Sequence, residues 1–136
     1  MRKIFADTSY LVATINSKDS LHRQALQISQ TLRDALLITT ELNLAELLNY
    51  FCRHGFFWRR RVVESVENIE INPNVFIVTL SQMSFAAGLR LYKQRSDKSY
   101  SFTDCVAMEF MKRENISEIL TADHHFEQEG FTALLR

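Results

Sequence analysis

The sequence predicts an α/β fold of three layers, with a central parallel sheet between two layers of helices. Short apolar runs alternate along the chain with longer segments of helical periodicity, a pattern typical of parallel strands joined by helices. The 136 residues include only three glycines and one proline, which argues against a loop-rich or all-β chain. Because no internal repeat, linker or low-complexity segment interrupts this pattern, we expect a single domain over residues 1–136.

The first half of the chain contains two predicted strands and four predicted helices. Residues 4–6 and 35–39 are short, uninterrupted apolar runs, as expected for buried strands. The helices are predicted through residues 11–15, from a cap at Asp19 or Ser20 to residue 32, from 41 to 54, and from 58 to 69.

The second half of the chain continues the alternation. A β-branched strand is predicted over residues 75–80, after the only proline, and a helix over residues 81–93. A polar loop at 95–99 leads to a helix over 101–113, a strand over 118–121 and a final short strand over 131–134. In open parallel sheets, ligands bind beyond the carboxyl ends of the strands, so polar residues just after strands are the candidates for function.

Two aspartates occupy that position. Asp7 follows the first strand and Asp123 follows the strand over 118–121. Each also fits a second interpretation, in which the side chain caps the N-terminus of the next helix, because Asp is a favoured capping residue. The pattern alone leaves both interpretations open.

Asp104 lies on the apolar face of a predicted helix. At 100° per residue it falls between Met108 and Met111, and a carboxylate there is costly unless something compensates its charge. A metal ion would do so. The alternative is a capping box, since Ser101 stands three residues earlier.

Glu46 is the acid with the weakest pattern. It stands in the middle of the predicted helix over 41–54, at the polar border of the helical wheel, where a solvated surface residue is common. Glu41 is the rival acid on the same helix, although acids in a first turn are frequent because they favour the helix dipole.

Four such acids gathered at one edge of a sheet would affect one another's charge and could bind a metal ion together. Their carboxylates would repel one another and raise each other's pKa values. A hard divalent cation such as Mg²⁺ or Mn²⁺ relieves this repulsion, because it prefers oxygen ligands. One or two such ions can activate water and neutralise charge on a phosphodiester.

Four segments of the chain resemble, in order, the motifs of PIN domains. They are IFADTSYLVA with Asp7, TTELNLAELLN with Glu46, SFTDCVAMEFM with Asp104, and ILTADHHF with Asp123. This resemblance implies a parallel sheet with helices on both sides, Mg²⁺ or Mn²⁺ bound by these four acids, and cleavage of single-stranded RNA. It also suggests hydroxyl contacts to the site from Thr8, Thr103 and Thr121, which a plain structural role would equally explain.

Among small, free-standing PIN domains, the chain is most similar to the VapC-like toxins of bacterial toxin–antitoxin pairs. That similarity implies an endoribonuclease held inactive by an antitoxin protein. It further implies that the neighbourhood of Phe56, Phe57 and Trp58 contributes to a homodimer or antitoxin interface, although stacking on bases and helix packing are alternatives.

Basic and histidine residues give weaker indications. The net charge is zero, which is unusual for a nucleic-acid binder, although an acidic site can offset basic patches. Residues 59–61 are a run of arginines that fits a solvated face, phosphate contact or an acidic partner. Lys93, Arg95 and Lys98 precede Asp104 and are better placed to hold RNA. His124–His125 is not assigned to the metal, because adjacent side chains point apart.

Other compartments and activities have less support. The apolar run after Met1 breaks at Asp7, too early for a secretory signal, and no run reaches the roughly 20 residues of a membrane span. We therefore expect a cytoplasmic protein whose Cys52 and Cys105 are reduced core thiols.

A haloacid dehalogenase-type phosphatase would need an aspartate where Ser9 stands. The remaining alternatives are a nuclease acting on flap DNA and, more seriously, an inactive PIN-like module that binds RNA or protein.

Overall fold

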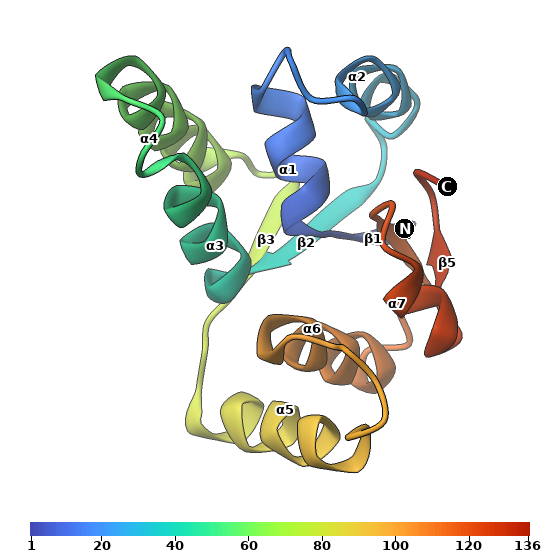
Figure 1. Ribbon diagram of the computed structural model, residues 1–136. Coiled ribbons are helices and arrows are strands. Elements are labelled where there is room, and N and C mark those ends of the chain that lie inside the picture. The colour runs from blue at the N-terminus through green and yellow to red at the C-terminus, as the bar shows by residue number, and fades with distance from the viewer.

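The computed structural model describes all 136 residues and has helices on both sides of one sheet (Figure 1). The strands are β1 (Lys3–Ala6), β2 (Leu36–Thr40), β3 (Val75–Val78), β4 (Glu118–Leu120) and β5 (Thr132–Ala133). The helices are α1 (Thr8–Ile15), α2 (His22–Thr31), α3 (Glu41–Phe51), α4 (Phe56–Ile71), α5 (Gln82–Gln94), α6 (Phe102–Arg113) and α7 (His124–Gln128).

The sheet is parallel throughout and has the strand order β3-β2-β1-β4-β5. The predicted three-layer α/β fold is therefore confirmed. β1 is the central strand and pairs with β2 on one side and with β4 on the other. Because all strands run the same way, their carboxyl ends meet at one edge, and Asp7 follows β1 in the middle of that edge.

Alternation along β1 divides the apolar residues into two cores. Ile4 and Ala6 pack on one face of the sheet with residues of α1, α2, α3 and α4, and Phe5 packs on the other with residues of α5, α6 and α7. All three β1 residues are at most 2% exposed. This double burial explains why the strand reads as a continuous apolar run in the sequence.

Close packing of α5 against α6 fixes the helix that carries Asp104. A Cβ atom at Gly88 of α5 would lie only 2.5 Å from Cγ2 of Val106 on α6, so no larger residue fits there without movement. The chain enters α6 through a capping box at Ser101. Together these contacts hold the first turn of α6 near the carboxyl edge of the sheet.

The structure differs from the predicted elements at several points. α7 was not predicted, because five residues are too few to show a helical period. β3 ends at Val78 rather than at residue 80, and the Leu80 N–H donates to Glu41 Oε1 at 2.8 Å instead of extending the ladder.

The expectation for the two cysteines was wrong in part. Cys105 is buried, but Cys52 is exposed just after α3 ends. None of the helices combines the length and apolarity that crossing a membrane requires.

Candidate metal centre

The four predicted acids come from the segments that follow three neighbouring strands and from the start of α6. Asp7 follows β1 directly, Glu46 is on α3 after β2, and Asp123 stands at the N-cap of α7 after β4. Asp104 is in the first turn of α6. Figure 1 shows the starts of α1, α3 and α6 converging toward the sheet edge.

Asp7 is buried among neutral hydrogen-bond donors. The residue is only 6% exposed to solvent. Thr121 Oγ1 donates to Asp7 Oδ2 at 2.8 Å, Ser9 Oγ donates to the same oxygen at 3.2 Å, and Asn43 Nδ2 donates to Oδ1 at 3.4 Å. Asp7 occupies the N-cap position of α1, yet its side chain makes no capping hydrogen bond. The capping interpretation therefore does not account for this carboxylate.

The electrostatic surroundings of Asp7 disfavour its charged form. Burial raises the pKa of Asp7 to about 7, the Thr121 hydroxyl opposes this rise, and the negative charge of Asp104 adds to it. No lysine, arginine or histidine forms an ion pair with Asp7 in the structure. No side chain of the protein therefore places a positive charge next to the Asp7 carboxylate.

Glu46 is connected to Asp7 through Thr8 and Asn43. Thr8 Oγ1 donates to Glu46 Oε1 at 2.7 Å, and Asn43 Nδ2 donates to Thr8 Oγ1 at 3.0 Å. Asn43 is itself fully buried and held by Thr40, whose hydroxyl donates to Asn43 Oδ1 at 2.6 Å. Glu46 is therefore half-buried and directed into the site rather than solvated.

Sequence reasoning missed Asn43, although a signal for it exists. Asn43 and Glu46 are three residues apart on α3, so they share a helix face. The buried amide of Asn43 contacts Asp7 directly and is linked to Glu46 through the Thr8 hydroxyl, so it helps to set the relative positions of the two acids.

Asp104 and Asp123 have capping roles in addition to their place at the edge. Asp104 Oδ2 accepts a hydrogen bond from the Ser101 N–H at 3.1 Å, which completes the predicted capping box. Asp123 Oδ1 accepts from the His125 N–H at 2.9 Å and so caps α7. Burial raises the pKa of Asp104, and the charge of Asp123 raises it further.

His125 completes a compact group with these two acids. One ligand atom each of Asp104, Asp123 and His125 lies within 4.8 Å of the others. The sequence argument that adjacent histidines point apart did not identify this residue, because the turn into α7 brings it to the site.

The donor set fits a hard divalent cation. Carboxylate oxygens predominate, two of the acids have raised pKa values, and the Nδ1 atom of His125 is buried with no hydrogen-bond partner. Asp104, Asp123 and His125 bring one ligand atom each into a compact group, Asp7 is near enough for the charge of Asp104 to raise its pKa, and Glu46 lies behind Thr8.

One expected RNA-binding residue has a structural role instead. The guanidinium of Arg95 pairs with Glu129, which Lys112 also contacts at 2.7 Å between Nζ and Oε2. Lys93 and Lys98 remain exposed, and Lys98 Nζ lies 3.9 Å from Asp97 Oδ2.

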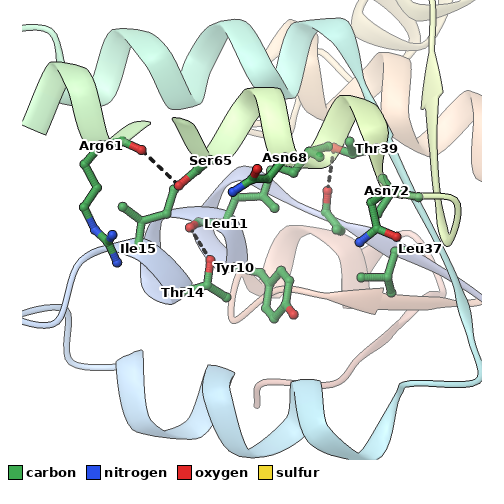
Figure 2. Close-up of a pocket in the computed structure, with 13 residues that line it drawn as sticks. Tyr10, Leu11, Thr14, Ile15, Leu37, Thr39, Arg61, Ser65, Asn68 and Asn72 are labelled. Carbon is green, nitrogen blue, oxygen red and sulfur yellow. Dashed lines mark hydrogen bonds between the residues drawn. The ribbon is translucent and has the colours of Figure 1, made fainter. Parts of the chain in front are cut away.

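A separate cavity of about 300 Å³ lies between α1 and α4 above β2 (Figure 2). Its lining is partly apolar and partly polar and includes Tyr10, Thr14, Arg61, Ser65 and Asn68. Thr39 also lines it and donates to the Ala6 carbonyl at 2.9 Å. No carboxylate lines this cavity, so it is distinct from the acidic cluster.

Comparisons with known proteins agree with this architecture. A family model described as PIN domain matches residues 4–131. The solved structure of VapC20 from Mycobacterium tuberculosis, described as a sarcin–ricin loop cleaving toxin, has a TM-score of 0.87 and 21% identity, over 96% of this chain and 98% of that chain. FitAcB from Neisseria gonorrhoeae has a TM-score of 0.62 and 18% identity, over 96% and 95% of the two chains. No curated protein matches the sequence.

Proposed function

This chain belongs to the PIN-domain family, and we propose that it is an endoribonuclease that uses Mg²⁺ or Mn²⁺ to cleave single-stranded RNA. We further propose that it is the toxin of a toxin–antitoxin pair and acts in the cytoplasm. Its two free cysteines are compatible with a reducing compartment.

The observation that carries this proposal is the carboxylate cluster at the carboxyl edge of the sheet, in which the buried Asp7 has no cationic partner. Asp7 is buried without a cation, and Asp104 and Asp123 lie together beside it. Buried charges without partners are expensive, so such a cluster needs a functional reason. A divalent ion held there would neutralise charge that develops on a phosphodiester and make water a better nucleophile.

The chain's own residues would fix the geometry of this reaction. Asn43 and Thr8 hold Asp7 and Glu46 at a set separation, so that the acids present oxygen ligands without rearrangement. Lys93 is exposed in the last turn of α5, and Lys98 is exposed in the loop that leads to α6, the helix that carries Asp104. Their charges would contact RNA phosphates.

Cleavage of a mixed pool of single-stranded RNA tests the proposal. We expect cleavage by the wild type with Mg²⁺ or Mn²⁺, and none with EDTA. We expect Asp7→Asn and Asp104→Asn to lose at least about a hundredfold in rate, because each removes a metal-binding charge. Asp34→Asn removes the same charge at an exposed residue before β2 and should cleave normally.

The result of this assay also decides between catalysis and binding alone. If the wild type binds the RNA pool but leaves it intact with either ion, the chain is the inactive PIN-like module. Cleavage that survives both Asp7→Asn and Asp104→Asn would mean that another site performs the chemistry.

An antitoxin partner is supported by the likeness to VapC20, which is described as a toxin, and by surface features of this chain. Arg61 lines the cavity between α1 and α4, where it would meet an acidic partner segment. We also propose a homodimer, because Phe56 and Phe57 are 77% and 66% exposed on α4. Trp58, by contrast, stacks on Phe51 at 5.4 Å between ring centroids and packs, half-buried, against the core.

Light scattering tests the homodimer. The wild type should have twice the mass of one chain, and a variant with Phe56→Ser and Phe57→Ser should have the mass of one. A wild type that has the mass of one chain at high concentration would exclude the dimer.

A further inference from the structure

We propose that His125 is a direct ligand of the metal ion at the acidic cluster, through Nδ1, and that this nitrogen makes the site prefer Mn²⁺ to Mg²⁺. The inference rests on the proposed function, because it requires a divalent ion beside Asp104 and Asp123. It adds a residue outside the four acids and a metal preference that the acids alone would not give.

The positions of three atoms suit one ion. His125 Nδ1 lies 3.2 Å from Asp123 Oδ1 and 3.6 Å from Asp104 Oδ2. Two neighbouring ligands of an octahedral ion, each about 2.1 Å from it, are about 3 Å apart. The two separations that involve Nδ1 are close to this value, and the carboxylate oxygens of the two acids lie within 4.8 Å of each other, so a modest adjustment allows all three atoms to contact one ion.

The Nδ1 atom has no other partner. It is buried and makes no hydrogen bond, since neither of its contacts with the two carboxylates has hydrogen-bond geometry. A buried polar atom without a partner is destabilising, and native structures seldom leave one. A bond from Nδ1 to a metal ion satisfies the atom and puts the ring proton on Nε2.

The fold holds the imidazole in place before any ion binds. The backbone N–H of His125 donates to Asp123 Oδ1, and the next residue, Phe126, is fully buried in the core. The ring packs beside Tyr100, with 5.5 Å between ring centroids, and Tyr100 in turn donates to Glu129. The ligand is therefore positioned by α7 and by the segment before α6.

The neighbouring histidine provides a matched comparison. The His124 side chain is 60% exposed, against 20% for His125, and its Nδ1 is 3.9 Å from Asp123 Oδ1. Only His125 combines burial with close approach to both acids. Because Mg²⁺ requires oxygen ligands more strictly than Mn²⁺ does, a nitrogen ligand shifts the preference toward Mn²⁺.

Electron paramagnetic resonance of Mn²⁺ bound to the full-length protein tests this inference without any activity measurement. We expect a nitrogen hyperfine coupling in the wild type and in His124→Ala, and its absence in His125→Ala. Labelling the histidines of the wild type with ¹⁵N should change the coupling accordingly, so the test holds even if a variant folds poorly. In His125→Ala the Mn²⁺ affinity should fall at least about tenfold, and the Mg²⁺ affinity less.

The outcomes separate this inference from the proposed function. Bound Mn²⁺ without a nitrogen coupling in the wild type would overturn the role of His125 and leave the four-acid site standing. A coupling that persists in His125→Ala would overturn it as well. If neither Mn²⁺ nor Mg²⁺ binds to the wild type, both the inference and the proposed metal dependence fail.

Discussion

Two buried carboxyl groups in this chain lie in opposite electrostatic surroundings. Burial alone would raise the pKa of Glu129, but hydrogen bonds and charges from Arg95 and Lys112 outweigh it and lower the pKa to about 2. Burial raises the pKa of Asp7 to about 7, and the groups that contact this carboxylate are all neutral. The same fold thus compensates one buried charge fully and leaves the other without a cation.

The contrast between Glu129 and Asp7 shows that a positive charge is missing beside Asp7. Glu129 is tied to α6 and to the segment before it, so its ion pairs serve the packing of the fold. Asp7 stands at the middle of the sheet edge beside other acids, where a lysine or arginine would occupy the space for a metal and a phosphodiester. An acid kept without a partner in this place is typical of a functional site.

The largest effect on stability should come from Asp7→Asn in metal-free protein. In an acid whose folded pKa is raised, the unfolded chain loses its proton first, so stability falls as pH rises from about 4 to about 7. At pH 8 with EDTA, Asp7→Asn should therefore raise the free energy of unfolding by about 4 kcal/mol, since the rise in pKa from about 4 to about 7 is worth roughly 1.4 kcal/mol for each pKa unit. Urea denaturation across this pH range measures the effect.

The pH dependence and a control variant test whether the charge of Asp7 destabilises the metal-free protein. The advantage of Asp7→Asn should become small near pH 4, because there the wild-type carboxyl group is protonated in the folded protein and close to half protonated in the unfolded chain. An advantage of equal size at pH 4 and pH 8, or a loss of stability at both, would show that the charge of Asp7 is not what destabilises the metal-free fold. Asp34→Asn, at an exposed site, should leave the stability unchanged.

A smaller and opposite effect is expected from Glu129→Gln. The pKa of Glu129 is lowered, so its stabilisation is present above about pH 4.5 and is lost as pH falls toward 2. At pH 7 the variant should lose about 2 kcal/mol, a discounted figure because Arg95 and Lys112 are partly exposed to water. Thermal unfolding from pH 7 to pH 2 should show the two proteins converging. Equal stability at pH 7 would remove the contrast with Asp7.

The strands of the fold and the four candidate acids could be proposed from the sequence for different reasons. Parallel strands that are buried on both faces leave uninterrupted apolar runs, so β1 and β2 could be predicted from residues 4–6 and 35–39. Asp7 could be proposed because it directly follows such a run. Glu46 had no comparable signal, and only the resemblance to PIN-domain motifs singled it out.

What the sequence could not provide depends on side-chain contacts between distant segments. The link from Asn43 to both Thr8 and Asp7 joins residues more than 30 positions apart, which no local pattern reveals. His125 was misjudged because the five-residue helix α7 has no readable period. Arg95 was expected to contact RNA, but in the structure it pairs with Glu129, which lies 34 residues later in the chain.

The most direct test of the central claim is the stability of the wild type and of Asp7→Asn at pH 8, each with EDTA and with saturating Mn²⁺. If the carboxylate of Asp7 helps to hold a divalent ion, the variant is the more stable protein in EDTA and the wild type gains more from Mn²⁺, so that the difference between them shrinks or reverses. If Mn²⁺ stabilises both proteins equally, Asp7 does not bind the ion. If Mn²⁺ stabilises neither protein, the metal centre proposed at this edge of the sheet is wrong.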